Sequence, residues 1–263
     1  MAETGTPERW ARFLEEHAPG LTWLASTLLE WGELPPLARK SWRVTVHTSR
    51  AGDVSGIAAL HGESGLLALA ALPGMPPPFL GEPELVTRLL GAPETLDAVF
   101  EAQPMLMLRR LPGFRRQVFV FDGEAPPRHP ALERAGAEAW DELEEFRKEA
   151  GGSVDPVTPA ELAGPVQRGL VWVLAQEDGA GAGAMFRVEG VARRRVQITD
   201  ACVRPSLRGQ GIGAALLRSA ANIARTEYAR GAVIAVAVDD IAERTTSRAG
   251  YTPAGFLDDI NLS

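Results

Sequence analysis

The residues best suited to do chemistry in this sequence form a glycine-rich turn, Arg208-Gly209-Gln210-Gly211-Ile212-Gly213. The glycines leave no side chain where the phosphates of a ligand must approach the backbone. The first N–H groups of a helix that follows such a turn have no partner inside the helix, and the helix dipole favours an anion there. Arg208 adds a positive charge beside them. The spacing predicts a phosphate-binding turn, although a turn of this kind can also be purely structural.

Two regular elements must position this turn. The strand expected over 195–203 is rich in β-branched and apolar residues, and Pro205 ends its pairing. The helix expected over 211–230 carries Ile212 and Leu216 on one face, so that the sheet can hold its first turn in place. A rigid helix start is what a phosphate cradle needs.

The rest of the second half reads as an α+β domain over 130–263. Apolar periodicity and turn residues predict, in order, a charged helix at 131–149, a helix that opens near Pro159, strands at 170–176 and 182–189 joined by a turn at Asp178-Gly179, the turn-bearing strand and helix, a strand at 232–238, a helix at 241–249 and a last strand at 251–262. The proline-rich segment 123–130 marks the expected domain boundary.

The first half, over 1–125, reads as a second and smaller α+β domain. Helices are expected at 8–16, 21–31, 84–90 and 94–102, and strands at 42–48, 55–61, 65–72, 105–111 and 117–121. Its order of helices, strand meander, helix and strand repeats the plan of the second half. Where a phosphate-binding turn would lie, the sequence has Leu72-Pro73-Gly74-Met75 followed by three prolines, which offer no N–H to a ligand.

The segment Val203-x-Pro205-x-x-Arg208-Gly209-x-Gly211-Ile212-Gly213 resembles the acyl-CoA signature of the GNAT superfamily of N-acetyltransferases. The resemblance extends over about 130–263 and implies the GNAT acyl-CoA N-acyltransferase fold, a mixed sheet with helices. It implies that acetyl-CoA is bound by Cys202, Val203, Arg208, Gly209, Gln210, Gly211, Ile212, Gly213 and Asp239. It also implies a bulge in the strand that ends at Val203, and a splay between this strand and the next parallel one.

The second motif of that superfamily is similar to the segment Asp239-x-x-Ala242-x-x-Thr245-Thr246-x-x-x-Gly250-Tyr251. Thr246 stands where many relatives place a tyrosine that protonates the departing CoA thiolate, and a threonine hydroxyl is a much poorer acid than a phenol. For the base that deprotonates the acceptor ammonium, the candidates are Asp200 on the signature strand and Glu149 near the acceptor side.

Composition narrows the possible partners. Lysine and arginine number 27 against 34 aspartate and glutamate residues, and the net charge of −7 argues against nucleic acid and anionic membranes as partners. The single cysteine, Cys202, cannot form an intrachain disulfide and reads as a small buried hydrophobe. No apolar run reaches the roughly 20 residues that span a bilayer. We expect a cytoplasmic protein without a bound metal.

Three functions are consistent with these patterns. The first is an enzyme that transfers an acetyl group from acetyl-CoA to the amine of an unidentified acceptor by direct attack. The second is a catalytically inactive, regulatory acyl-CoA-binding module, because Thr246 replaces the usual acid. The third is an interaction protein that only retains the fold. The resemblance also suggests a tandem protein with a degenerate first GNAT-like unit, either monomeric or homodimeric.

Overall fold

The computed structural model describes residues 6–30, 41–75, 78, 83–136, 139–151, 165–176 and 181–263. The chain divides into two compact units, of which the first comprises Met1–Val118 and Ala254–Ser263 and the second comprises Phe119–Pro253. The expected domains, 1–125 and 130–263, differ from these units chiefly at the C-terminus, because the last ten residues group with the first unit.

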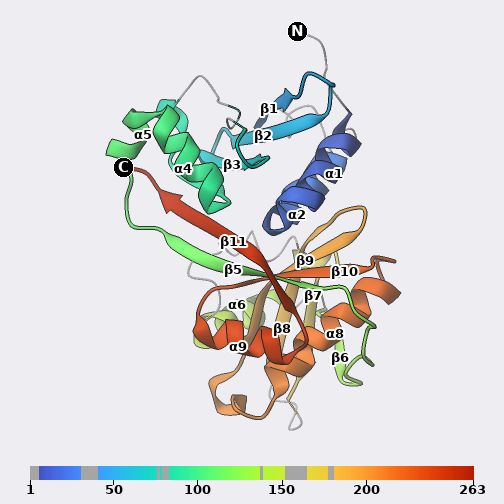
Figure 1. Cartoon of the computed structure of the whole chain (residues 1–263). Helices are drawn as coiled ribbons and strands as arrows, with labels where there is room; N and C mark the ends of the chain where they lie inside the picture. The colour runs from blue at the N-terminus through green and yellow to red at the C-terminus, as the bar shows by residue number, and fades with distance from the viewer. Residues whose placement is uncertain are drawn as a thin grey trace. The chain divides into compact units, whose positions relative to one another are not determined.

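The first unit contains a sheet with helices (Figure 1). Its elements are α1 (Pro7–His17), η1 (Pro19–Leu21), α2 (Thr22–Glu30), β1 (Trp42–Thr48), β2 (Val54–His61), β3 (Leu66–Ala71), η2 (Pro83–Leu85), β4 (Arg88–Gly91), α4 (Pro93–Ala102), α5 (Pro104–Leu108), most of β5 (Phe114–Phe121) and most of β11 (Thr252–Asn261). Strands β1, β2 and β3 form the antiparallel meander that the sequence predicts, and β4 runs parallel to β3.

Two elements of the first unit differ from their predictions. The segment expected as a helix at 84–90 contains η2 and strand β4, whose last three residues are buried. The segment expected as a strand at 105–111 begins with helix α5, which has Pro104 at its first turn. Both errors concern short apolar runs, for which periodicity does not separate a strand from a buried helix.

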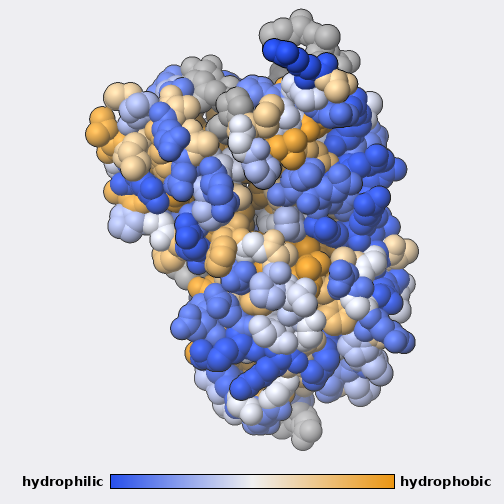
Figure 2. Space-filling view, viewed as in Figure 1, coloured by the Kyte–Doolittle hydropathy of each residue, from blue (hydrophilic) through white to orange (hydrophobic). Residues whose placement is uncertain are grey.

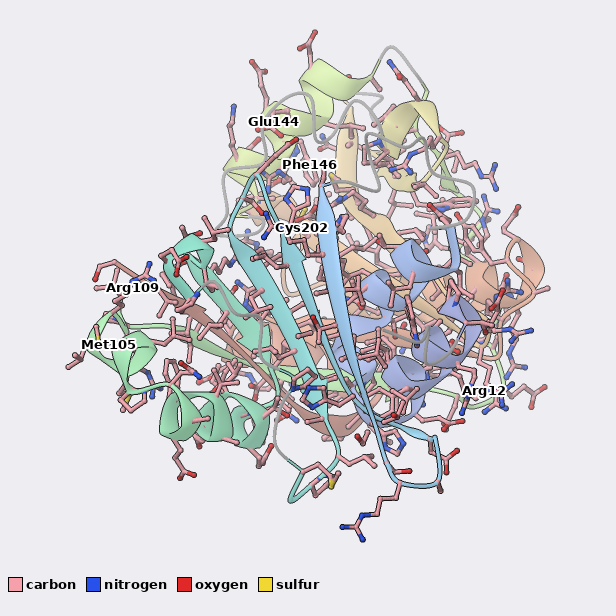
Figure 3. The ribbon with its side chains drawn as sticks, turned by 90° about the horizontal axis from the view of Figure 1, so that it is seen from above. Arg12, Met105, Arg109, Glu144, Phe146 and Cys202 are labelled. Carbon is pink, nitrogen blue, oxygen red and sulfur yellow. The ribbon has the colours of Figure 1, made fainter. Side chains whose placement is uncertain are left out.

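Helix α5 is exposed along most of its length. Of its apolar side chains only Leu106 is buried, whereas Met105 and Leu108 are 65% and 79% exposed. Figure 2 shows apolar surface over this helix, and Met105 points outward in Figure 3. Arg109, the residue after the helix, donates hydrogen bonds to the carbonyl oxygens of Pro83 and Val86. These bonds fix a helix that buries little apolar area.

The C-terminal strand β11 is held in the first unit by ion pairs as well as by backbone pairing. It pairs antiparallel with β4. Asp259 accepts two hydrogen bonds from Arg88, at 2.7 and 2.6 Å, and one from Arg116 at 2.9 Å. Asp258 accepts two from Arg115, both at 2.8 Å. Bidentate arginine–carboxylate pairs specify geometry well, so these charges fix the strand in its register.

The second unit also combines strands and helices, which confirms the predicted α+β class with a mixed sheet (Figure 1). Its elements are β6 (Leu132–Arg134), α6 (Trp140–Glu149), β7 (Val171–Ala175), β8 (Ala182–Val191), β9 (Arg195–Val203), η3 (Pro205–Leu207), α8 (Ile212–Thr226), β10 (Ala232–Ala237) and α9 (Asp240–Arg248). Strands β6 to β9 pair antiparallel in order, and β10 pairs parallel with β9.

Helices α8 and α6 pack against different sets of residues from the sheet of the second unit. Leu216 and Ile223 of α8 share a buried cluster with Phe186 of β8. Leu143 and Phe146 of α6 share another cluster with the residue of β8 just before Phe186, Met185, and with Cys202 of β9. Because successive side chains of a strand point to opposite faces, α8 and α6 cover opposite faces of the sheet.

The charged helix expected at 131–149 begins later than predicted. Residues 132–134 form strand β6, in which buried Leu132 pairs with Leu174 of β7. Helix α6 starts only at Trp140. A three-residue edge strand leaves almost no periodic signal, and the acidic sequence that follows it favours a helix. The helix expected near Pro159 and the turn expected at Asp178-Gly179 lie outside the described residues.

Candidate coenzyme site

The turn between β9 and α8 has the backbone that its glycines predict. Gly209 and Gly211 have φ of +79° and +80°, in the left-handed region that disfavours side chains. A Cβ atom built at either position would meet nothing within 4 Å. Gly211 is the N-cap of α8, so the unpaired N–H groups of the helix begin at Ile212. This open, exposed backbone fits a phosphate group.

The third glycine of the turn has a packing role of its own. A Cβ atom on Gly213 would lie 3.0 Å from the Cγ2 atom of Thr245 and 3.6 Å from the Cγ2 atom of Val203. Gly213 therefore lets α9 and the end of β9 approach the first turn of α8. The three glycines of the turn therefore have two roles. Gly209 and Gly211 leave the backbone of the turn exposed, whereas Gly213 allows close packing around the start of α8.

Arg208 is oriented by two backbone carbonyl groups. Its Nε atom donates to the carbonyl oxygen of Val203 at 3.1 Å, and its Nη2 atom donates to that of Ala150 at 2.5 Å. Ala150 directly follows α6, so the arginine ties the end of this helix to the glycine turn. The guanidinium group brings a permanent positive charge to the turn.

Strand β9 carries a bulge three residues before its end. The pairing with β8 passes from Thr199–Arg187 to Cys202–Met185, which leaves one extra residue in β9. Within that interval Asp200 has a φ of +52°, which is uncommon for a residue other than glycine. The bulge expected in this strand is confirmed.

Strands β9 and β10 also separate as expected. Their parallel pairing runs over four residue pairs and ends at Ile198–Ala235, whereas β9 continues to Val203. The last five residues of β9 therefore have no pairing with β10. A strand with a free edge can pair with an extended ligand that carries amide groups.

Asp200 lies at this bulge, but its carboxylate is not free. The side chain is 1% exposed, and one oxygen atom, Oδ2, accepts a hydrogen bond from the Nε atom of Arg187 at 3.0 Å. The other oxygen, Oδ1, lies 3.8 Å from the Nη1 atom of Arg147. Arginine side chains from two other elements therefore occupy the space around the Asp200 carboxylate, which is not open to an acceptor amine.

Thr246, which stands at the expected acid position, and Tyr251 both carry hydroxyl groups in the second motif. The buried Thr246 hydroxyl donates to the carbonyl oxygen of Ala242 at 2.7 Å. Tyr251 is buried, donates to the carbonyl oxygen of Leu217 at 2.9 Å, and has a pKa raised by burial. Both hydroxyl groups are used inside the fold.

Asp239 caps a helix. Its Oδ1 atom accepts a hydrogen bond from the N–H of Ala242 at 2.7 Å, which makes it the N-cap of α9. The sequence predicted a hydrogen-bond acceptor at this position near the coenzyme, and the structure gives that acceptor a local partner.

Cys202 and Val203 form the end of β9. Cys202 is 8% exposed, and desolvation together with Asp200 raises the pKa of its thiol to about 12. A thiol of this kind is not a nucleophile at neutral pH. The side chain of Val203 packs against the cluster that contains α8.

Glu149, the second candidate base, is also paired. Its Oε2 atom accepts a hydrogen bond from Arg204 at 3.0 Å, and the guanidinium group of Arg204 lies 5.5 Å from the ring centroid of Phe146. Sequence reasoning missed Arg204, Arg147 and Arg187. The only available signal was the i,i+3 spacing of Glu144 and Arg147 on an expected helix.

Among the described helices, none is long and apolar enough to cross a membrane. In the same part of the chain, no three histidine, cysteine or acidic side chains are grouped so that they could hold a metal ion.

Comparison with known proteins agrees with this geometry. The model of the acetyltransferase (GNAT) family matches residues 137–251. A comparison with curated proteins found no significant sequence match.

Several solved structures share the fold over most of the chain. A Drosophila protein is 14% identical, with 98% of this chain and 97% of that chain covered and a TM-score of 0.64. A GCN5-related N-acetyltransferase from Sphaerobacter thermophilus is 14% identical, with 97% and 91% covered and a TM-score of 0.58. A tandem GNAT protein from the clavulanic acid biosynthesis pathway is 14% identical, with 97% and 94% covered and a TM-score of 0.55. Residues 137–251 of this chain therefore form a domain of the acetyltransferase (GNAT) family.

Proposed function

We propose that the second unit is an acetyl-CoA-dependent N-acetyltransferase. The observation that carries the proposal is the open backbone at Gly209 and Gly211, followed at once by the start of α8. In this proposal the N–H groups at the start of α8 and the charge of Arg208 bind the pyrophosphate. The free edge of β9 near Cys202 and Val203 bonds the amides of the pantetheine arm.

The proposed reaction is direct transfer without a covalent enzyme intermediate. The neutral amine nitrogen attacks the thioester carbonyl carbon, the C–N bond forms, the C–S bond breaks, and the thiolate of CoA leaves and takes up a proton. Backbone donors near Val203 stabilise the negative charge that develops on the carbonyl oxygen. The acceptor must first lose a proton from its ammonium group.

Asp200 and Thr246 are the proposed base and acid on sequence grounds, and each needs a rearrangement to act. Asp200 must leave an ion pair with Arg187, and Thr246 must release the carbonyl oxygen of Ala242. This observation favours a second candidate function, a regulatory module that binds acyl-CoA without turning it over. Release of CoA thiol in the presence of a panel of primary amines separates the two functions.

The binding site is tested by calorimetric titration with acetyl-CoA and CoA. A double variant, Arg208→Glu with Gly211→Glu, places two negative charges at the proposed pyrophosphate site, and we expect it to bind neither ligand. The matched control is Arg50→Glu with Gly74→Glu in the first unit, where Gly74 also has a positive φ and open space around it. This control should bind as the unaltered protein does.

Two results would count against the proposal. An unaltered protein that binds neither ligand refutes it directly. Equal binding by the double variant and its control places the coenzyme elsewhere. Circular dichroism of both variants verifies that each is folded.

The first unit is proposed to be a GNAT-like unit without a coenzyme site. Its antiparallel meander β1–β2–β3, with β4 parallel to β3, repeats the order β7–β8–β9 with β10 parallel to β9. Helix α4 follows β4 as α9 follows β10. The likeness to a tandem GNAT protein is consistent with this proposal.

A further inference from the structure

Four charged side chains form a buried group between α6 and the sheet of the second unit. Glu144 and Arg147 lie on α6, Arg187 on β8 and Asp200 on β9, and their side chains are 6%, 4%, 18% and 1% exposed. The Nε atom of Arg147 lies 3.4 Å from the Oε2 atom of Glu144. Two positive and two negative charges make the group neutral. Figure 3 labels Glu144 together with Phe146 and Cys202, which belong to the apolar cluster on this face.

The contact between α6 and β9 in this group is imperfect. Arg147 Nη1 and Asp200 Oδ1 lie 3.8 Å apart, and both are buried without a hydrogen-bond partner. Buried polar atoms are almost always hydrogen bonded, so such a pair needs an explanation other than stability. Replacing a buried ion pair by apolar residues of similar size is often neutral or stabilising.

The ion pair between Arg147 and Asp200 lies where the backbone of β9 is strained, at Asp200. The φ of Asp200 is +52°, a conformation that is costly for a residue other than glycine and persists only where the surrounding structure enforces it. Arg187 holds one carboxylate oxygen from β8, and Arg147 lies beside the other from α6. The carboxylate therefore accepts a hydrogen bond from β8 and has a second positive charge beside it from α6, at the residue where β9 departs from regular pairing.

The bulge leaves the residue after Asp200, Ala201, at the surface. Ala201 is exposed although Asp200 and Cys202 on either side of it are buried. It lies on the part of β9 that continues beyond the last residue pair with β10, Ile198–Ala235. A change in the bulge would rotate the backbone of Ala201 first.

We propose that Arg147 and Arg187 are positioning residues, which act through the Asp200 carboxylate to hold the β9 bulge so that the backbone at Ala201 and Cys202 faces the pantetheine arm and its thioester. This proposal rests on the proposed function of the second unit. It gives Asp200 a positioning role in place of the role of base.

The test compares two ligands that differ in the pantetheine arm. ADP carries a pyrophosphate without the arm, and acetyl-CoA carries both. Arg147→Met removes the charge at similar length. Lys148→Met is the matched control, because Lys148 also contacts Glu144 from the same helix but is 67% exposed. Calorimetric titration of each protein with each ligand gives the dissociation constants.

We expect Arg147→Met to weaken acetyl-CoA binding about tenfold or more, because small misplacements of positioned groups are costly. Its affinity for ADP should stay within about twofold, a free-energy change well below that of a tenfold loss, because ADP lacks the arm that the bulge is proposed to position. Lys148→Met should bind both ligands as the unaltered protein does. Asp200→Asn, which removes the pair from the other side, should repeat the pattern of Arg147→Met, and Arg147→Lys should restore part of the affinity.

Two outcomes overturn the proposal. Unchanged acetyl-CoA binding by Arg147→Met shows that the bulge does not depend on this pair. Equal loss for ADP and acetyl-CoA shows that the pair supports the unit as a whole, which is a structural role. Failure of the proposed function looks different, because the unaltered protein itself then binds no acetyl-CoA.

Discussion

The connection between the third meander strand and the following parallel strand differs between the two units. In each, a third meander strand leads to a parallel strand, from β3 to β4 in the first unit and from β9 to β10 in the second. Each connection contains a glycine with positive φ and open space around it, Gly74 in one and Gly211 in the other. The residues after these two glycines differ. Three prolines come soon after Gly74, whereas α8 begins directly after Gly211.

The two turns differ in the hydrogen-bond donors that follow the glycine. A left-handed glycine lets the chain turn, but the donors come from the first N–H groups of a helix. Proline has no N–H to donate. In the described part of the β3–β4 connection, the only regular element is the three-residue η2. The second unit has the turn and the donors together.

The largest effects are expected on the free energy of unfolding, from substitutions in the hydrophobic core of each unit. Phe186 in the second unit and Leu89 in the first are both fully buried. Phe186→Ala should lower the free energy of unfolding by about 3–5 kcal/mol, and Leu89→Ala by about 2–5 kcal/mol. Urea denaturation followed by circular dichroism measures both.

Coenzyme binding then separates the two core variants. Leu89→Ala should leave the affinity for acetyl-CoA unchanged at temperatures where the protein remains folded, because the proposed coenzyme site lies in the second unit. A loss of affinity in Leu89→Ala under these conditions would show that the fold of one unit depends on the other.

Smaller effects on stability and on coenzyme affinity are expected from substitutions of Gly211 and Gly74. Gly211→Ala and Gly74→Ala should each cost about 1 kcal/mol of stability, because both force a side chain into left-handed backbone. Only Gly211→Ala should weaken acetyl-CoA binding, by about tenfold. Thermal unfolding and calorimetric titration of both variants give the two quantities. Equal affinities would remove the functional difference between the turns.

The smallest effect concerns Cys202, which is the only cysteine and therefore reports on the second unit alone. Burial raises the pKa of its thiol from 9.0 to about 12, so the folded protein should react slowly with iodoacetamide at pH 8 and the unfolded chain much faster. Because the folded pKa is raised, its contribution to stability is complete below about pH 9 and is lost as the pH rises toward 12.

Mass spectrometry after timed alkylation gives the reaction rate of the thiol. Leu89→Ala in the first unit should not change this rate, whereas Phe186→Ala should raise it. Fast alkylation of the unaltered protein would contradict the buried position of Cys202.

The sequence by itself determined the features that depend on local residue types. The strand predicted at 195–203 has those bounds in the structure, and α8 starts one residue after the predicted position. Glycine, proline and β-branched residues act through their own backbone preferences, which do not depend on distant partners. The family signature lies in this same segment, and so the resemblance could be stated from the sequence.

Tertiary structure alone decided the features that depend on distant partners. Short strands such as β4 and β6 exist because neighbouring strands supply their hydrogen bonds, and no local pattern encodes that supply. The last ten residues join the first unit although they come after the second in the sequence. Asp200 looked like an available base, but arginines 13 residues before it and 53 residues before it surround its carboxylate. The partners of a buried charged group are chosen by tertiary packing, because folding brings together side chains that lie far apart along the chain.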